Sequence, residues 1–582
     1  MSDTVDGGGV DLRLAIPALF AWVAVAAAIA WPAALVALAV TAGATTGLLV
    51  VAAVVARSRP ALGVAALVAC AATLVLASAA VDAPQRRPAS LLEAASAGRF
   101  IEATAETTQT AFETTGSFTV TLTKVTVGDT AVNGSTPARV FGAPPERTLG
   151  IGATIAVRGT LAATAPEDEL AFLLFTDAPP ELIAPPPWYL DWANALRARF
   201  RAAAADLPGD GAALLPGLAI GDTSAVGTEL DEAMMTSSLS HLTAVSGANC
   251  AVVIGLIMVA GGVLGVPRGW RIASSACVLV SFVVLVTPEP SVLRAALMAF
   301  LVLLSLAGGR PARGVPVLGL AVIGLLTFDP WLARSYGFVL SVLATAGLLL
   351  LAGPLTRTLG RWLPIPVAAL IAIPLAAQLA CQPVLILLNP SIPTYGVVAN
   401  VLAGPAAPTA TVLGLLACIL LPWAAGAGTL LAMLAWVPSA WIAAVATFFA
   451  ALPGNRIPWP DGGVGAALVA VVATLIVVIA IRSPDGPDRW RRIAAAVLAL
   501  ALAAYVGVVS GNSLRAALTR PANWQYAACD VGQGDAMIVR SRGQVALIDT
   551  GADQALVLAC LDTLGISRID LLVLSHFDID HV

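Results

Sequence analysis

The end of the chain holds its densest group of side chains that could do chemistry. The sequence HFDIDH places two imidazoles and two carboxylates directly after IDLLVLSH (569–576), an apolar run typical of a buried strand. Imidazole and carboxylate ligands at this spacing indicate a metal site. A divalent ion, zinc or manganese, could lower the pKa of a bound water and supply a hydroxide nucleophile. The predicted metal ligands are His576, Asp578, Asp580 and His581.

A strand hairpin and a helix must position this motif. The segment 528–553 predicts a strand, a glycine turn ending in Asp535, a hairpin at Ser541-Arg542-Gly543, and a strand ending at Asp549. A helix near 553–564 then leads into the apolar strand.

The third histidine stands at the start of an apolar run. His241 opens HLTAVSGANC, in which Ser246, Gly247 and Asn249 follow. Polar groups at that depth in a membrane segment are costly and usually face a cavity or a partner helix. The same residues could instead hold two helices together by hydrogen bonds.

Two arginines also fall inside apolar segments. Arg294 lies about one turn into PSVLRAALM (290–298), and Arg334 lies in DPWLARSYGF (329–338). An intramembrane arginine is a functional candidate, and a channel for a polyanion needs cations in its wall. A structural ion pair is the alternative for both, and Arg334 could also extend to the membrane interface.

Composition decides which class of protein positions these residues. The chain of 582 residues is 58% hydrophobic and 11% charged, with a mean hydropathy of +0.89. Soluble domains carry about 25% charged residues, so a purely soluble enzyme, a disordered chain and a nucleic-acid binder with bulk basic charge are excluded. Seven cysteines without paired spacing predict neither a disulfide framework nor a zinc ribbon.

Thirteen apolar windows are long enough, or nearly so, to cross a bilayer. The first lacks the basic flank of a cleavable signal, so we expect an anchor. Arginine pairs in alternate short loops place the N-terminus in the cytoplasm and both polar regions, 83–240 and 511–582, outside. The windows are 14–31, 34–56, 61–81, 242–264, 272–288, 291–309, 315–328, 333–353, 366–388, 394–421, 428–450, 464–482 and 493–510.

The first polar region changes its period. Short β-branched runs such as FTVTLTKVTV (118–127) and TIAVRGTLAAT (154–164), separated by turn residues, predict a small β-barrel resembling an OB-fold. This barrel could bind nucleic acid, but its acidic balance favours a brace at the channel mouth. Residues 188–207 predict an amphipathic helix that lies in the membrane interface or packs on the barrel, with Arg197 and Arg201 on a separate face.

The order of motifs resembles the ComEC family of competence membrane channels, which carry transforming DNA into bacteria. GLAIGD (217–222), HLTAVSG, SVLRAALM, the DPW…GF…LS stretch and TYGVVANVLAGP (394–405) come first, and DVGQGDA then opens a metallo-β-lactamase-like domain. Two positions depart from the family, with Asn249 in place of a histidine and Val339 in place of a glutamine. The family's hydrolase domain extends well beyond Val582, so we expect only its N-terminal part here, without catalytic activity of its own.

The resemblance implies a function and roles for residues. One DNA strand, bound without regard to sequence, would cross the membrane bundle while the outer metal domain degrades its complement. Asp580 and His581 would take part in catalysis, and membrane lipid and other competence proteins would be partners. Residues implied in translocation are His241, Ser246, Gly247, Asn249, Arg294 and Arg334, and those supporting the metal motif are Asp530, Gln533, Asp535 and Asp549.

The predicted domains are N-terminal helices (1–82), the OB-like domain (83–187), an interfacial helix and linker (188–240), the channel domain (241–510) and the start of the metallo-β-lactamase-like domain (511–582). Two other functions stay open. A solute transporter would also have buried arginines and a broken helix at 394–421. A membrane-tethered metallohydrolase would need far fewer helices.

Overall fold

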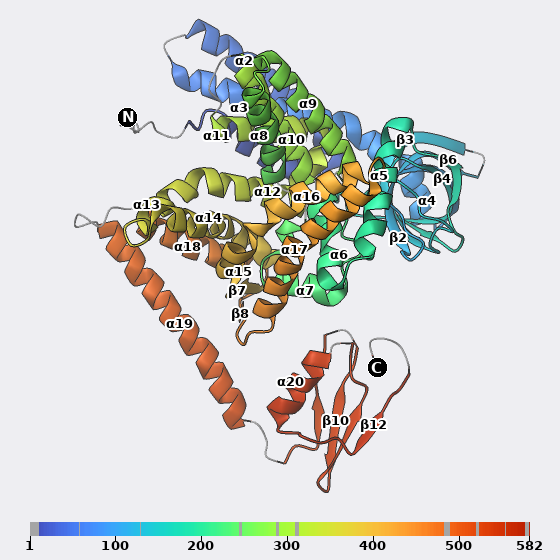
Figure 1. Cartoon of the computed structure of the whole chain (residues 1–582), viewed down its shortest axis with the longest axis vertical. Helices are drawn as coiled ribbons and strands as arrows, with labels where there is room; N and C mark the ends of the chain where they lie inside the picture. The colour runs from blue at the N-terminus through green and yellow to red at the C-terminus, as the bar shows by residue number, and fades with distance from the viewer. Residues whose placement is uncertain are drawn as a thin grey trace. The chain divides into compact units, whose positions relative to one another are not determined.

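The computed structural model of the chain describes residues 11–56, 59–128, 130–243, 247–286, 290–308, 313–481, 489–519, 523–532, 534–552, 554–576 and 581. The chain divides into two compact units, Met1–Arg491 and Arg492–Val582. The first unit holds most of the helices and a six-stranded sheet, and the second holds a four-stranded sheet (Figure 1).

Apolar helices make up most of the first unit, and each predicted window there contains a helix or a broken helix. The bounds are α1 (Ala15–Ala28), α2 (Leu35–Val55), α3 (Pro60–Arg86), α8 (Gly247–Val263), α9 (Arg268–Leu285), α10 (Pro290–Ala307), α11 (Gly314–Phe328), α12 (Tyr336–Gly347), α13 (Gly353–Leu359), α14 (Ile365–Leu388), α15 (Gly396–Ala403), α16 (Ala406–Leu420), α17 (Ala425–Ala450) and α18 (Gly462–Ile481). Short 3-10 or π turns, η1 (Pro32–Ala34), η3 (Pro330–Arg334) and η4 (Leu348–Ala352), and a strand pair, β7 (Ser391–Pro393) with β8 (Arg456–Pro458), connect them.

Length and composition define a polytopic helical membrane protein. Within the described ranges, eight helices could cross a membrane, or nine if α15 and α16 form one span. These two meet at 45°, because Pro405 between them cannot continue the hydrogen-bond ladder. Five further apolar helices are 10–17 residues long. The count of thirteen spans therefore stays a prediction.

A short buried helix lies where the sequence suggested only a linker. Three helices, α5 (Trp188–Ala205), α6 (Gly209–Ile220) and α7 (Thr228–Thr236), precede the turn η2 (Ser240–Leu242). A Cβ built on Gly211 of α6 would lie 2.7 Å from the Cβ of Ala440 in α17, and one on Gly414 of α16 would lie 2.7 Å from that of Ala219. Only glycine permits such close helix contact, so α6 packs between α16 and α17 by means of small residues.

The six-stranded sheet follows the predicted β-rich region. Its strands are β1 (Phe100–Thr107), β2 (Ser117–Val127), β3 (Thr130–Gly142), β4 (Thr154–Ala163), β5 (Phe172–Thr176) and β6 (Glu181–Ala184). Their order is β1-β2-β3-β5-β4-β6, and β1 also pairs with β4. Alternate residues such as Phe118, Val120 and Leu122 point into one core, which α4 (Ala89–Ser96) covers with Leu91 (Figure 1).

The second unit contains most of α19 (Arg489–Thr519) and continues as a small α/β sheet. Strands β9 (Tyr526–Ala528), β10 (Met537–Ser541) and β11 (Gln544–Ile548) are antiparallel, and β12 (Leu571–Val573) pairs in parallel with β11. A parallel neighbour needs a crossover, which α20 (Gln554–Leu564) supplies (Figure 1). Val557 and Leu561 of α20 pack on Ile538 and Leu547 of the sheet.

A disulfide corrects the prediction drawn from cysteine spacing. Cys529, just after β9, is bonded to Cys560 in α20, with the two Cα atoms 5.9 Å apart. The two cysteines are separated by 31 positions in the sequence, a spacing that matches no known motif. The packing of α20 on the sheet brings the two cysteines together, whereas the other five are free.

Candidate functional site

The carboxyl ends of β11 and β12 form the best-defined polar cluster of the second unit. Ile548 pairs with Val573 in parallel register, so Asp549 and Ser575 follow at the same sheet edge. The Asp549 carboxylate accepts the Ser575 backbone N–H at 2.7 Å and the Ser575 hydroxyl at 2.7 Å. Asp549 also has a left-handed backbone, with φ 55°. Such a conformation costs free energy in a non-glycine residue and persists where the surroundings impose it.

Two histidines of the predicted metal motif join this cluster. His581 Nδ1 lies 3.1 Å from Asp549 Oδ2, and His576 Nδ1 lies 2.8 Å from the Ser575 hydroxyl. The imidazole centroids are 3.9 Å apart. The structure thus brings together His576, His581 and Asp549, all three predicted from the sequence. Ser575 had no signal beyond its place before His576.

The other predicted members of this site fall into two groups. Asp578, Asp580 and Gln533 lie outside the described residues. Asp530 accepts the Gly532 N–H at 3.4 Å, and Asp535 is exposed in the same turn. The roles of all five stay predictions.

The hydrogen bonds keep Asp549 ionised. The backbone N–H and then the hydroxyl of Ser575, with a smaller contribution from His581, lower the pKa of Asp549 to about 2. A carboxylate bonded to one imidazole nitrogen fixes the ring orientation and leaves the other nitrogen for a metal, which is a frequent arrangement around metal-bound histidine. Two imidazoles with this support fit a metal as donors. Among the described residues, however, no three His, Cys, Asp or Glu side chains form a group that could hold an ion.

Arg294 is the buried cation of the membrane helices. It lies in α10 with 6% of its surface exposed. Its Nε donates to the Ser341 hydroxyl of α12 at 2.8 Å, and Nη1 approaches Met298 Sδ at 3.4 Å. Among the described residues, no carboxylate forms an ion pair with it. The charge is therefore held by neutral partners, and Ser341 is a partner that sequence analysis missed.

The motifs around His241 converge on one place. His241 lies in η2 and is exposed. Ser238 O accepts Asn400 Nδ2 of α15 at 3.1 Å, and Thr243 approaches Gly217 of α6. Residues of GLAIGD, HLTAVSG and TYGVVANVLAGP therefore lie together. The side chain of Asn249, and Ser246 as a whole, lie outside the described part, and Gly247 begins α8.

Arg334 joins the bundle to the β-sheet. Its Nε donates to Ala26 O at 3.0 Å, and Nη1 pairs with Glu167 of the β4–β5 loop at 3.4 Å. Beside it, Trp331 donates to Pro166 O at 2.9 Å. The Arg86 guanidinium stacks 4.4 Å over the Trp331 ring. These contacts hold η3 against the β4–β5 loop.

Arg197 is buried in the helix that was predicted to be amphipathic. Its side chain is only 3% exposed. Nε donates to Leu285 O at 2.9 Å and Nη2 to Val284 O at 2.7 Å, at the last carbonyls of α9. Nη1 donates to Asn194 Oδ1 at 2.7 Å. Desolvation lowers the pKa of Arg197 to about 10, so it stays charged at neutral pH.

Asn194 extends these contacts to the sheet. Its Oδ1 accepts Ile151 N–H at 3.2 Å and its Nδ2 donates to Ile151 O at 2.9 Å. Helix α5 therefore connects the β-sheet to α9, while Trp188 at its start is 82% exposed.

Fold and site together define a polytopic helical membrane protein with a metallo-β-lactamase-like C-terminal region. Residues 218–484 match the competence protein family, and residues 529–582 match the metallo-beta-lactamase superfamily. A competence-family (ComEC) domain followed by a metallo-beta-lactamase match is consistent with a ComEC-family protein. No curated protein and no solved structure matches it.

Proposed function

We propose that the chain conducts one strand of transforming DNA, without regard to sequence, across the cell membrane during natural competence. The competence-protein match supports a role in DNA uptake. The observation on which the channel proposal depends is Arg294, a buried guanidinium held by Ser341 and Met298 and without an ion-pair partner in the described part of the chain. Burying an uncompensated charge is expensive. A passing phosphate would offset that cost.

A second support is the meeting of three motifs that carry the family resemblance. Ser238, Asn400 and Gly217 draw η2, α15 and α6 together beside His241. We assign His241, Ser246, Gly247 and Asn249 to the entrance of the channel. Arg334, paired with Glu167, would brace the entrance rather than contact the strand.

We infer that the β-sheet is an OB-like domain and that it lies outside the cytoplasm together with the C-terminal domain. The pairing order β1-β2-β3-β5-β4 with the added β1–β4 pair supports the OB-like assignment. The Cys529–Cys560 disulfide supports an oxidising compartment for the C-terminal domain. The domain division predicted from the sequence, a cytoplasmic N-terminus and contacts with lipid and other competence proteins are parts of the same proposal.

The C-terminal domain would hold zinc or manganese through His576, Asp578, Asp580 and His581. The superfamily match supports metal dependence in general. When bound, the ion would supply a water of lowered pKa for hydrolysis. Asp549 and Ser575 would hold the two imidazoles in place for it.

Uptake of labelled DNA into a deletion strain complemented with variants tests the channel proposal. Arg294→Gln should abolish uptake while the protein persists in the membrane at near wild-type level. Ser341→Ala is the control, because it removes the hydrogen-bond partner and keeps the charge, and it should retain most uptake. Equal loss of membrane protein in both variants would return Arg294 to a structural role.

The bent pair α15–α16 leaves a solute transporter as a second candidate. Uptake of DNA that depends on Arg294 would not be expected of a solute transporter. Tests on His241 use the same assay, with His241→Ala expected to abolish uptake.

A further inference from the structure

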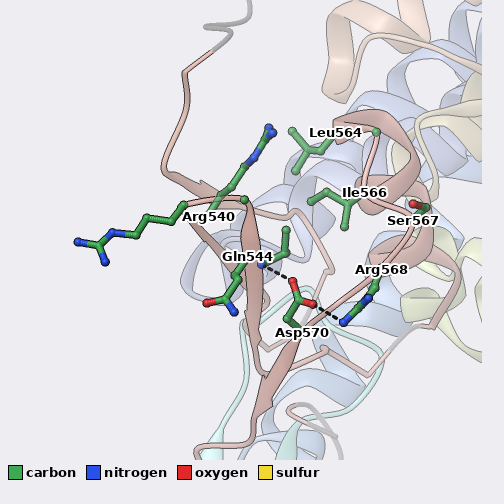
Figure 2. Close-up of a pocket in the computed structure, with 11 residues that line it drawn as sticks. Arg540, Gln544, Leu564, Ile566, Ser567, Arg568 and Asp570 are labelled. Atoms are coloured by element: carbon green, nitrogen blue, oxygen red, sulfur yellow. Dashed lines mark hydrogen bonds and ion pairs between the residues drawn. The ribbon is translucent and has the colours of Figure 1, made fainter.

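Every lysine or arginine of residues 523–582 lies in one place. This segment contains three arginines, Arg540, Arg542 and Arg568, against eight aspartates. All three arginines line a recess of about 380 Å³ between the β10–β11 turn and the connection from α20 to β12 (Figure 2). A segment with an excess of acid thus concentrates all its fixed positive charge on one surface.

The one carboxylate in this recess is already engaged. Asp570 accepts the Val545 N–H at 3.0 Å and pairs with Arg568 Nη2 at 3.0 Å (Figure 2). It therefore fastens the start of β12 to β11 and orients the Arg568 guanidinium, whose side chain is 83% exposed. Arg540 and Arg542 are exposed as well, which leaves the recess with a net positive charge.

The turn presents Arg542 against its own backbone preference. Arg542 has φ 51° and Gly543 has φ 82°, the two positive angles of a type I′ hairpin turn. Asparagine, aspartate or glycine is the usual residue at the first of these positions, and another side chain there costs roughly 1–2 kcal/mol. An arginine kept at this position places a cation at the tip of the hairpin.

One aromatic ring lies against an arginine of the recess. The Arg540 guanidinium lies 5.7 Å from the centroid of the Trp524 ring, and the backbone N–H of Arg540 donates to Gln525 O at 2.8 Å. Arginines that contact phosphates and aromatic rings that stack on bases are the two components of surfaces for single-stranded nucleic acid.

This surface is separate from the cluster around Asp549. The recess contains the start of β11, and Asp549 follows its end, five residues later. At about 3.3 Å per residue, the two lie roughly 17 Å apart along the strand.

We propose that Arg540, Arg542 and Arg568, with Trp524, form a binding surface for the phosphodiester backbone of single-stranded DNA, distinct from the hydrolytic cluster. The proposal rests on the proposed function in DNA uptake and adds the place where the C-terminal domain holds a strand. Three guanidiniums can contact three phosphates, and the exposed recess fits an extended strand better than an enclosed nucleotide.

The test uses the full chain in nanodiscs of neutral lipid and a fluorescent single-stranded oligothymidylate. The variant combines Arg540→Gln, Arg542→Asn and Arg568→Gln, in which asparagine suits the turn and protects folding. The control combines Arg13→Gln, Arg357→Gln and Arg361→Gln, which remove the same charge from exposed positions of the first unit. Retention of the Cys529–Cys560 disulfide, read as a mass shift after reduction, checks the fold.

We expect the variant to raise the dissociation constant about tenfold and to flatten the slope of log affinity against log salt by about 2, which is three contacts at about 0.7 each. The control should match the wild type. A Trp524→Ala variant should weaken binding without changing the slope, because stacking is not electrostatic.

Other outcomes overturn the proposal in distinguishable ways. If the triple arginine variant binds the oligonucleotide as tightly as the wild type does, this surface is refuted and the proposed function is left intact. A wild type that does not bind at all contradicts both. Full competition by millimolar inorganic phosphate would mean a small-anion site only. If the triple arginine variant loses binding to anionic vesicles but binds the oligonucleotide as the wild type does, the arginines form a membrane-facing surface instead.

Discussion

The Asp549 carboxylate accepts the backbone N–H of Ser575 at 2.7 Å, across the carboxyl ends of two parallel strands. The same carboxylate bonds the Ser575 hydroxyl and His581. One ionised group therefore determines where both histidines of the cluster lie, one directly and one through Ser575. These hydrogen bonds lower the pKa of Asp549. Lowering the pH therefore tests the arrangement, because protonating the carboxylate weakens the bonds.

Acidification should loosen this sheet edge only well below neutral pH. Asp549 has its pKa lowered from 3.8 to about 2. A depressed pKa in the folded state stabilises the fold above the unfolded value, and the contribution is lost as the pH falls from about 4 towards 2. Pulsed hydrogen exchange over 544–576 in the full chain, with chelator present, should show protection that declines in this window. Asp549→Asn should be less protected at pH 6 and lack the decline. An unchanged profile in Asp549→Asn would contradict the assignment.

Removing the disulfide should destabilise the C-terminal domain alone. Closing a loop of 31 residues is worth about 3–4 kcal/mol in the chain-entropy account. In the Cys529→Ser, Cys560→Ser variant, residues 523–576 should therefore become sensitive to protease at a lower urea concentration than in the wild type. The urea concentration at which the helical unit becomes sensitive should not change. Cys277→Ser, at an exposed free cysteine, is the matched control. Equal urea midpoints with and without the bond would show that the domain is held by its core alone.

Apolar windows long enough to cross a bilayer predicted most helices of this fold, because a membrane helix satisfies its own backbone hydrogen bonds and needs little more than such a window. Every apolar window of the first unit contains a helix, and the β-branched runs became strands. Helix α6 was not predicted because it is short. Its burial depends on contacts of Gly211 and Gly414 with residues far along the chain. Periodicity reports one helix face at a time and says nothing of distant partners.

The polar sites show the same division. Asp549 and His576 could be predicted because each closely follows an apolar strand, and parallel strands place such residues at one edge. His581 could be predicted from its place in the HFDIDH motif. The helical pattern placed Arg197 on a face separate from the apolar one, but it could not show that two carbonyls of α9 accept hydrogen bonds from that side chain. The spacing of Cys529 and Cys560 did not predict their disulfide, because tertiary packing brings the two residues together.

A double-mutant cycle should distinguish bracing from translocation at Arg334. The pair with Glu167 is partly exposed, so its interaction energy should be only about 0–1 kcal/mol. Arg334→Ala, Glu167→Ala and the double variant should then reduce DNA uptake modestly and to the same extent. Uptake that is abolished by Arg334→Ala but normal in Glu167→Ala would instead assign the arginine to the strand path.

Arg197 should be among the most sensitive positions outside the site. Replacing it with methionine preserves the apolar stem but leaves the Leu285 and Val284 carbonyls without their donors, and Asn194 loses its partner. Each buried group left unsatisfied costs about 1–3 kcal/mol. Arg197→Met should therefore lower the thermal unfolding temperature of the purified chain clearly. Arg197→Lys should rescue it only in part, since one ammonium cannot reproduce the planar fork. Arg199→Met, at the exposed position two residues further on, should have little effect. If Arg197→Met and Arg199→Met unfolded at the same temperature, the hydrogen bonds that connect the β-sheet through α5 to α9 would not contribute to the stability of the fold.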